Sequence, residues 1–590
     1  MCGFSGIITN YQNNIDKNFL STLLNHRGPD MNGFYEDENS GFKLFFNRLS
    51  IQDLSKNGNQ PFIYKNLVLV ANCEIYNFKN IKSLLIDKYE FKSETDSEVL
   101  IYAYKEWGDK FLDYLEGMFS IVIYNKEDKS IKLFRDRFGI KPLYYFLDDG
   151  NFIFSSEFLP IVKILKKLNK VLNFNYQSIN NFIYAGYNFE SSTNIKNIYK
   201  VKPSHFISLK NFEIQEIKYW ELKKNKKTFN FDESLSIIEN QFNVTVKNHL
   251  ISDVPISILL SGGLDSSLIT YFSSLNENQE NLSTITINMD NEISDSEKRN
   301  ISFLKKNFSI KNEILNIESK NIIKDIEKNI NVFDDLQSAD AGYLTNNEIA
   351  KKLSNSNCKV VLVGDGSDEI FGGYSWFGLS KFPFSILNEN IKNLIYFYAI
   401  SRTINFLKIK KIFNKFNQNI KNISESYFDK ICKNELFSQL PNNYLMKVDK
   451  PFMKNSIEAR VPYLDHKFVE NVYNISNNFK LKGKTYSFSS FKKPNEKFIL
   501  RQVAKKKFTN EIFNTKKKGF SISTSKLINE NKDLFFEVIN DNKSYIGFED
   551  KKKITDSLYK VKESKYNPIL KNREIVLWKL FLFNIWKANV

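Results

Sequence analysis

Residues 258–267, ILLSGGLDSS, join an apolar run of strand length to a glycine-rich turn and then to a helical pattern. Backbone N–H groups at such a turn, together with the dipole of the following helix, favour phosphate oxygens. No Gly-Lys-Ser/Thr follows, so the turn is not a Walker A loop. A second apolar run, residues 360–363, leads into another glycine-rich stretch, residues 364–374 (GDGSDEIFGGY). Buried strands that alternate with helices predict a parallel α/β sheet in this part of the chain.

The chain has 590 residues, which is more than one hydrophobic core usually organises, so at least two domains are expected. Short apolar strand patterns with a few helices, such as residues 97–107, predict a layered α+β fold before residue 210. We expect a first domain at residues 2–210, a polar, lysine-rich linker at residues 211–231, and a second domain at residues 232–590. Helical patterns dominate the end of that second domain.

Composition excludes several classes of protein. With 42% hydrophobic and 26% charged residues, the chain is typical of a globular protein rather than a disordered or fibrous one. No apolar run is long enough to span a bilayer, and the start lacks the pattern of a secretion signal. We therefore expect a cytoplasmic protein with no membrane partner. Four scattered cysteines and four histidines argue against a disulfide framework or a structural zinc site.

The formal net charge is +17, from 84 basic and 67 acidic residues. Such a charge suits an anionic partner such as nucleic acid. The lysines are, however, spread along the whole chain, and no recognition module accompanies them. Composition alone therefore does not favour a nucleic-acid partner.

Cys2 follows the initiator methionine directly. Removal of Met1 would leave Cys2 with an α-amine, whose ordinary pKa of about 7.7–8 lets it act as the base for its own thiol. Other short motifs follow Cys2 in a fixed order. They are residues 2–7 (CGFSGI), 26–30 (HRGPD), 47–51 (NRLSI), 60–61 (QP), 72–77 (NCEIYN), 95–98 (TDSE) and 135–144 (RDRFGIKPLY).

This ordered set resembles the class II, N-terminal-nucleophile glutamine amidotransferase domain and covers residues 2 to about 160. The resemblance implies that Cys2 attacks the side-chain amide of glutamine, with Asn72 and the backbone N–H of Cys73 stabilising the oxyanion. A guanidinium suits a carboxylate, and acidic side chains suit an ammonium group. The implied glutamine-binding residues are Arg48, Ile51, Asn72, Glu74 and Asp96.

Cys73 departs from the family pattern, which has glycine at this position. A backbone N–H is still available there, but a positive φ would cost a cysteine more than a glycine. We therefore expect that glutamine hydrolysis survives and is slower. If Cys73→Gly leaves hydrolysis unchanged or lowers it, this strain argument is wrong.

The string SGGLDS at residues 261–266 resembles the PP-loop of ATP pyrophosphatases. Residues 363–374, 456–465 (SIEARVPYLD) and 516–520 (KKKGF) extend the resemblance to the synthetase domain of glutamine-dependent asparagine synthetase. The resemblance implies catalytic roles for Asp365 and Lys517, with a register uncertain by one residue among Lys516–Lys518. It implies Mg²⁺ ligands in Asp265 and Asp368. The implied ATP-binding residues are Leu260, Ser261, Gly262, Gly263, Asp265, Ser266, Ile287, Val363 and Gly364.

Together these motifs predict a two-step enzyme that uses glutamine, ATP and Mg²⁺ to amidate a carboxylate through an acyl-adenylate. Aspartate is the default acceptor, which would make the chain an asparagine synthase (glutamine-hydrolysing). The alternatives are another carboxylate, such as a sugar uronate or a secondary metabolite, an intramolecular ring closure, and a PP-loop enzyme that modifies RNA. Relatives are often dimers, so a homodimer is expected by analogy alone.

Overall fold

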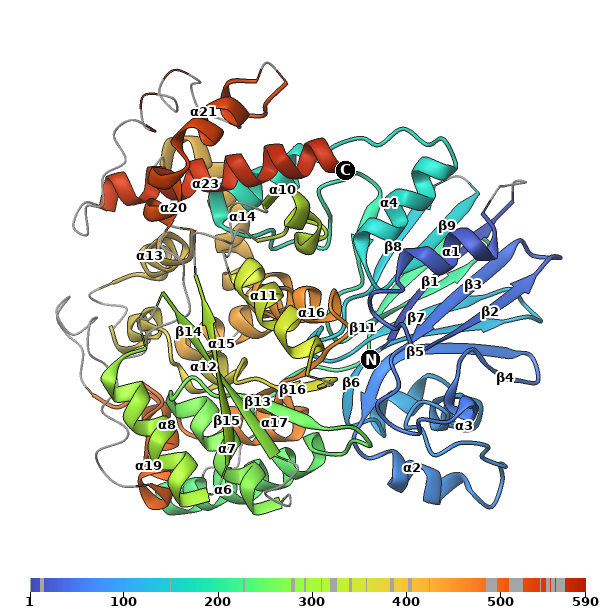
Figure 1. Cartoon of the computed structure of the whole chain (residues 1–590), viewed down its shortest axis with the longest axis horizontal. Coiled ribbons are helices and arrows are strands. Elements are labelled where there is room, and N and C mark those ends of the chain that lie inside the picture. Colours follow the sequence, from blue (N-terminus) through green and yellow to red (C-terminus); the bar gives the residue numbers. More distant parts are fainter. Residues whose placement is uncertain are drawn as a thin grey trace.

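The computed structural model describes residues 2–590 except residues 11–14, 149, 226–228, 277–281, 291–292, 309, 319–325, 339–341, 357, 383–386, 402–405, 424, 484–495, 509–523, 542, 548–551, 553–555, 557 and 559–567. Within the described residues, two antiparallel sheets form from the first part of the chain and one parallel sheet forms from the second (Figure 1). The predicted change from an α+β region to a parallel α/β region is confirmed.

The two antiparallel sheets each have six strands in the described chain. The first has the order β10-β8-β9-β1-β3-β2, and the second has the order β12-β11-β7-β6-β5-β4. The strands of the first sheet are β1 (Cys2–Thr9), β2 (Met31–Asp37), β3 (Phe42–Arg48), β8 (Tyr144–Asp148), β9 (Asn151–Ser155) and β10 (Ile198–Lys200). Those of the second are β4 (Phe62–Tyr64), β5 (Leu67–Ile75), β6 (Gly117–Asn125), β7 (Ile131–Arg135), β11 (His205–Lys210) and β12 (Glu213–Lys218).

Side-chain alternation along β5 explains why these sheets stack. Val68 and Val70 face Phe4 and Phe46 of the first sheet, whereas Leu69 and its odd-numbered neighbours pack under helices on the outer face. The outer faces carry α1 (Lys17–Leu23) and α4 (Phe158–Lys167) on the first sheet, and α2 (Phe78–Leu85) and α3 (Val99–Trp107) on the second. A short helix, α5 (Tyr176–Asn180), follows them. This four-layer unit is called the sandwich below.

The parallel sheet has the order β15-β14-β13-β16-β17. Its strands are β13 (Ile256–Leu259), β14 (Leu282–Met289), β15 (Lys311–Ile317), β16 (Val360–Leu362) and β17 (Glu458–Arg460). From β13, the next strands in the chain, β14 and β15, are added on one side of the sheet. Strands β16 and β17 are then added on the other side of β13, so the strand order reverses between β13 and β16. Ligands of open α/β sheets bind at such a reversal, outside the carboxyl ends of the strands.

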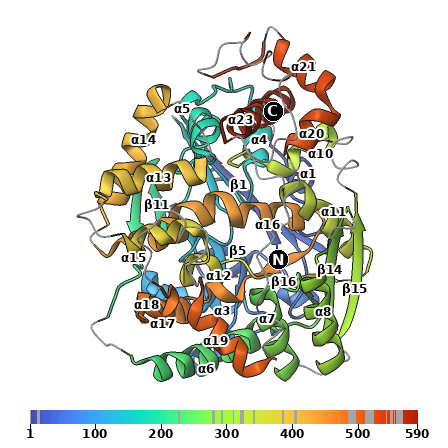
Figure 2. The ribbon, with the colours of Figure 1, turned by 90° about the vertical axis from the view of Figure 1, so that its left-hand side faces the viewer.

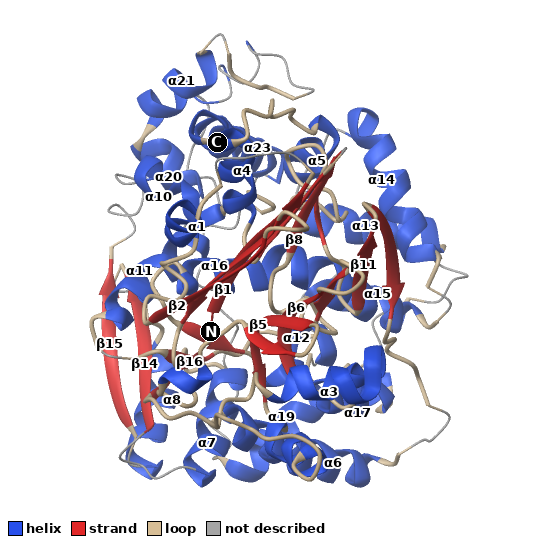
Figure 3. Ribbon diagram, turned by 90° about the vertical axis from the view of Figure 1, so that its right-hand side faces the viewer, coloured by secondary structure: helices blue, strands red, loops and turns tan. Residues whose placement is uncertain are grey.

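Helices pack around this sheet and form the C-terminal part of the molecule (Figures 1 and 3). Those near the sheet are α6 (Phe231–His249), α7 (Leu264–Asn276), α8 (Asp295–Phe308), α10 (Ile326–Asn329), α11 (Gly342–Ser354), α12 (Ser367–Phe371), α16 (Leu445–Met453), α17 (His466–Asn474), α18 (Asn477–Lys480) and α19 (Phe498–Lys507). The others are α13 (Glu389–Ser401), α14 (Phe406–Lys421), α15 (Tyr427–Asn434), α20 (Thr524–Glu530), α21 (Lys532–Asn540) and α23 (Pro568–Asn589). The helical character expected towards the C-terminus is confirmed.

One local prediction also matches closely: the helix expected at residues 97–107 is α3. Helix α6 begins at Phe231 with a capping box between Asn230 and Glu233. β12 falls inside residues 211–231, the expected linker, where it pairs with β11. None of the described helices is both long and apolar enough to cross a membrane.

Helix α23 connects the C-terminal end of the chain to the sandwich (Figure 2). Trp586 is fully buried, its ring lies 6.1 Å from that of Phe158, and its Nε1 donates to the carbonyl of Asp334 at 2.7 Å. The Asp334 carboxylate in turn accepts from the backbone N–H groups of Phe158 and Leu159. Trp586 therefore stabilises the contact between the two halves.

We expect Trp586→Ala to destabilise the protein by about 3–5 kcal/mol, because it removes a large buried side chain. Trp586→Phe keeps most of the packing and loses the bond to Asp334, so its effect is about 1–3 kcal/mol. Thermal unfolding midpoints measure both, with the exposed Leu84→Ala as the control. An unchanged midpoint in Trp586→Ala would contradict this role.

Candidate functional site

Cys2, Arg48 and Asn72 meet at the edge of the sandwich. Cys2 begins β1 and lies opposite Arg48 of β3 in the strand register. Asn72 comes from β5 of the facing sheet, and its Oδ1 accepts a hydrogen bond from the Cys2 backbone nitrogen at 3.2 Å. The nucleophile predicted from the sequence and two predicted glutamine-binding residues therefore lie together.

The side-chain amide of Asn72 has the properties of an oxyanion donor. Asn72 is fully buried, and its Nδ2 has no hydrogen-bond partner among the described residues. A buried N–H group without a partner is costly, and substrate-binding sites are a common reason for its presence. Because Oδ1 is held by the Cys2 nitrogen, Nδ2 is the part of this side chain that can stabilise charge developing on a substrate.

Burial raises the pKa of the Cys2 thiol, and the Leu49 backbone N–H and the Arg48 guanidinium partly offset this rise. Arg48 itself is almost completely buried. Its Nη1 donates to the Ser55 carbonyl at 2.6 Å, and its Nη2 donates to the carbonyls of Gln52 and Asp53. These bonds hold the guanidinium in one orientation beside Cys2.

The structure does not support the expected strain at Cys73. Its φ is not positive, because the residue lies within β5 opposite Phe119 in regular ladder pairing. Its side chain points to the outer face of the sheet, where Sγ lies 3.6 Å from Oδ2 of Asp96. The difference from glycine is therefore a thiol against Asp96, and the expected backbone strain at Cys73 is absent.

Asp96 also accepts a hydrogen bond from the Ile75 backbone at 2.7 Å. Burial raises the pKa of Asp96 to about 6, although that hydrogen bond opposes the rise. The Asp96 carboxylate thus lies close to Cys73 and to β5, the strand that also carries Glu74. This position fits the predicted role of Asp96 and Glu74 in binding the ammonium group of glutamine.

Glu74 contacts the parallel-sheet half of the molecule. Its Oε2 lies 2.9 Å from Nη2 of Arg460, and its Oε1 accepts from the amide of Gln52. Burial raises the pKa of Glu74 well above its usual range, against the effect of Arg460. The carbonyl of Ile51 accepts from the backbone of Asp253 at 2.9 Å, which is a second contact between the halves.

The glycine-rich turn after β13 has the geometry expected of a phosphate loop. Gly262 has a φ of 73°, and a Cβ there would lie 2.8 Å from the Glu297 carbonyl, so this position requires glycine. Ser261 Oγ and Ser266 Oγ lie 3.0 Å apart, and Ser261 Oγ accepts from the Gly263 backbone at 3.2 Å. Helix α7 begins directly after the turn.

The predicted ATP-binding residues lie around the carboxyl ends of three neighbouring strands. Leu260 follows β13, Ile287 lies near the end of β14, and Val363 and Gly364 follow β16. Gly364 lies against the loop, since a Cβ there would lie 3.3 Å from Cβ of Asp265. This is the edge at which the strand order reverses.

Asp265 and Asp368, the two predicted metal ligands, face each other across that reversal. Lys497 Nζ lies between them, 2.8 Å from Asp265 Oδ2 and 2.7 Å from Asp368 Oδ1. Ser367 Oγ donates to Asp265 Oδ1 at 2.8 Å. Lys497 is not among the residues predicted from the sequence, because no motif marks a lysine just before α19.

Carboxylate oxygens are the donors that Mg²⁺ prefers, and Mg²⁺ is often held by one or two carboxylates together with substrate phosphates. The pair Asp265 and Asp368 fits this requirement, because both carboxylates already share a cation in Lys497. In the part of the chain described by the structure, no group of three or more His, Cys, Asp and Glu side chains is arranged for a metal. A site of this kind would therefore be completed by phosphate oxygens.

Asp365 is half-buried in the turn between β16 and α12, three residues before Asp368 in the chain. Lys517 and its neighbours lie outside the described residues. Buried next to Asp368, Glu369 accepts from the Tyr374 hydroxyl at 2.8 Å, and burial together with Asp368 raises its pKa to about 7.

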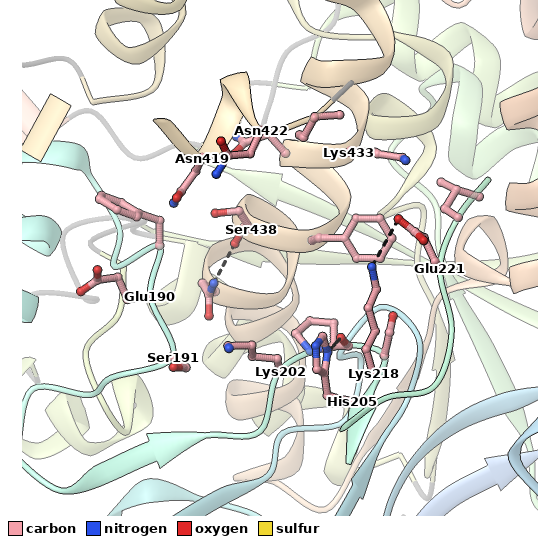
Figure 4. A pocket seen from close by; sticks show the side chains of 18 of the residues that line it. Glu190, Ser191, Lys202, His205, Lys218, Glu221, Asn419, Asn422, Lys433 and Ser438 are labelled. Carbon is pink, nitrogen blue, oxygen red and sulfur yellow. Dashed lines mark hydrogen bonds and ion pairs between the residues drawn. The ribbon is translucent and has the colours of Figure 1, made fainter. Parts of the chain in front are cut away.

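A separate cavity of about 800 Å³ lies between the strands that end the sandwich and the helices around α14 and α15 (Figure 4). None of the predicted site residues lines it. Its lysines are largely paired with carboxylates, such as Lys218 with Glu221 and Lys433 with Glu425. This cavity is therefore not the place where either predicted reaction would occur.

The fold and the two sites define a glutamine amidotransferase domain joined to an ATP-using synthetase domain. Residues 1–220 match the family model of the glutamine amidotransferase domain, and residues 238–587 match that of asparagine synthase. The second match alone covers more than half of the chain, so the chain belongs to the asparagine synthase family.

Curated relatives have about the same length. Asparagine synthetase (glutamine-hydrolysing) 1 of Bacillus subtilis is 28% identical over 88% of this chain and 87% of its own. Asparagine synthetase B of Escherichia coli is 29% identical over 64% of each chain. Amidase chyE of Penicillium rubens is 26% identical over 84% of this chain and 83% of its own.

Among solved structures, a glutamine phosphoribosylpyrophosphate amidotransferase of Bacillus subtilis is 13% identical with a TM-score of 0.28, covering 53% of this chain and 65% of its own. That similarity is too low to support any statement about function.

If Asn72 Nδ2 stabilises the oxyanion, Asn72→Ala lowers kcat for glutamine hydrolysis by about 10²–10³-fold. Glutamate release measures this effect. Ser120→Ala is the matched control, because Ser120 is buried opposite Asn72 in the same ladder. A loss below tenfold in Asn72→Ala, or an equal loss in the control, would contradict the role.

The pKa of Asp96 predicts a pH dependence. A carboxyl group with a raised pKa of about 6 is ionised, and able to bind an ammonium group, above that pH. We expect kcat/KM for glutamine to fall about tenfold per pH unit below pH 6. Rates measured from pH 5 to 8 test this, and Asp96→Asn should abolish the inflection; an inflection that persists there belongs to another group.

Proposed function

We propose that this protein is an asparagine synthase that hydrolyses glutamine and uses the ammonia and ATP to convert L-aspartate into L-asparagine, with glutamate, AMP and diphosphate as the other products. The observation that carries the proposal is the presence of both half-sites in one chain of this family. The amide nitrogen of Asn72, which has no hydrogen-bond partner among the described residues, lies beside Cys2, and a PP-loop faces a second acidic loop across the strand reversal. The proposed domains are residues 2–210 and 232–590, with residues 211–231 between them.

In the first half-reaction, the Cys2 sulfur attacks the side-chain carbonyl carbon of glutamine, and the α-amine exposed by removal of Met1 takes the thiol proton. Asn72 and the Cys73 backbone N–H stabilise the oxyanion. Arg48 holds the α-carboxylate, and Asp96 and Glu74 hold the α-ammonium group, with the Ile51 backbone lining the site. Ammonia leaves, and water then cleaves the thioester to glutamate.

In the second half-reaction, the Ser261–Ser266 loop holds the ATP phosphates, while Leu260, Ile287, Val363 and Gly364 surround the adenosine. An oxygen of the acceptor carboxylate attacks the α-phosphorus, and the bond to diphosphate breaks. Asp265 and Asp368 would hold Mg²⁺, which neutralises charge on the leaving diphosphate. Lys497 and Lys517 add positive charge there, and Asp365 lies beside the acyl-adenylate. Ammonia attacks the acyl carbon, and AMP leaves.

Ammonia passes internally between the two sites, which keeps it away from water and unprotonated. A second acceptor deserves testing, because a relative of similar identity and coverage is named an amidase rather than an asparagine synthetase. The alternative is thus the same chemistry on a different carboxylate, such as a sugar uronate or a secondary metabolite.

Incubation with glutamine, ATP, Mg²⁺ and aspartate should yield asparagine, AMP and diphosphate in equal amounts. Cys2→Ala should abolish this reaction with glutamine but preserve it with ammonia, because the thiol serves only the first half-reaction. Chromatography of the amino acids and a diphosphate assay measure both. Glutamate release without asparagine would reject aspartate as the acceptor, and loss of ammonia-dependent synthesis in Cys2→Ala would reject the division of labour.

A further inference from the structure

We propose that Arg460 is a positioning residue that couples the glutamine site to the nucleotide site. Its guanidinium group contacts Glu74 in β5, strand β17, and the segment between α6 and β13 that leads into the PP-loop. The inference rests on the proposed function, because it takes Glu74 as part of the glutamine site. Glutamine binding at the first site then raises the affinity of the second site for ATP, and the chemical steps at both sites stay the same.

The Arg460 side chain joins the sandwich to the parallel sheet. Its Nη2 lies 2.9 Å from Oε2 of Glu74 in β5, and its Nε donates to Oε1 of Glu458 in β17 at 2.5 Å. Arg460 and Glu458 are fully buried, and Glu74 is nearly so. One guanidinium thus neutralises a carboxylate in each half. Because both carboxylates are buried, water cannot take the place of the guanidinium in stabilising their charge.

The same side chain also holds the approach to the PP-loop. Its Nη1 donates to the carbonyls of His249 at 2.8 Å and Ile251 at 2.6 Å. These residues connect α6 to β13, and β13 ends at the PP-loop. In the same connection, the Asp253 carboxylate accepts from the backbone of Asp53, next to the predicted glutamine-binding residue Ile51.

The backbone of Arg460 contacts the nucleotide side of the sheet. Arg460 pairs with Leu362 in the parallel ladder, and its carbonyl accepts from the Val363 N–H at 2.9 Å. Three residues further along the chain, the Tyr463 hydroxyl donates to the Asp265 carbonyl at 3.1 Å. A displacement of Arg460 would therefore shift the backbone of Val363, through the direct hydrogen bond, and that of Asp265, through Tyr463.

An ammonium group bound near Glu74 favours the ionised carboxylate and so strengthens its ion pair with Arg460. The guanidinium is planar and rigid, so a stronger contact at Nη2 also fixes Nε and Nη1. Coupling between two binding sites is reciprocal and typically changes affinity by about 5–150-fold. Lysine keeps one charge at this position but cannot contact Glu74, Glu458 and two carbonyls together.

The test uses full-length enzyme carrying Cys2→Ala, in which glutamine binds without being hydrolysed. Ammonia-dependent diphosphate release is measured against ATP concentration, with and without saturating glutamine. We expect glutamine to lower the half-saturating ATP concentration about fivefold or more. Adding Arg460→Lys should reduce that shift to less than twofold, while the maximal rate with ammonia stays within about threefold.

Lys467→Met is the matched control, because Lys467 pairs with Glu116 across the same two halves, 2.5 Å apart, away from Glu74. It should leave the glutamine-dependent shift intact. If Arg460→Lys does not fold, Glu458→Gln keeps the shape of the side chain and removes its charge, which weakens the contact with Nε, and it should at least halve the shift. An unchanged shift in Arg460→Lys, an equal loss in Lys467→Met, or no shift in the Cys2→Ala parent would overturn the proposal.

The outcomes separate this inference from the proposed function. If the Cys2→Ala parent releases no diphosphate with ammonia, ATP and any acceptor carboxylate tried, the proposed function fails. If diphosphate is released and only the effect of Arg460→Lys is absent, the coupling role fails and the proposed function stands.

Discussion

Arg27 is a fully buried guanidinium at the contact between the two halves of the molecule, and its partners come from both. Its Nε donates to the Cys2 carbonyl, its Nη1 donates to Glu157 of the sandwich at 2.8 Å, and both terminal nitrogens contact Asp449 of α16. A buried charge of this kind is tolerable only when every partner is in place. The start of β1 can therefore be ordered in this way only when the two halves have docked.

The charge network continues from Arg27 towards the C-terminus. Although burial opposes the shift, nearby His26, Lys450 and Arg27 hold the pKa of Glu157 well below its usual range. Lys450 pairs with Asp334, which caps the start of α4 and accepts from Trp586. The contact between the halves is thus built largely from buried ion pairs, which specify one arrangement. A single docked arrangement is what the proposed transfer of ammonia between the two sites requires.

Particular elements show how far the sequence could be interpreted. Short apolar runs predicted β13 and β16, because both strands are buried in the parallel sheet. The motifs around Cys2, Asn72 and Asp96 predicted a shared site, and these residues do lie together. Cys73 was misjudged because its backbone conformation depends on ladder pairing with Phe119, which motif order does not reveal. Lys497 was missed because its partners, Asp265 and Asp368, are more than a hundred residues away in sequence.

The sequence by itself determined the two classes of domain and predicted the nucleophile and the phosphate loop, because each depends on a local pattern of apolar spacing, glycine or a few adjacent side chains. Only the tertiary structure decided which charges meet. The contacts of Arg27 with Asp449, of Arg460 with Glu74 and of Lys497 with two carboxylates all join residues far apart along the chain. Such pairs form because burial removes water from each charge and leaves an opposite charge as the remaining way to stabilise it.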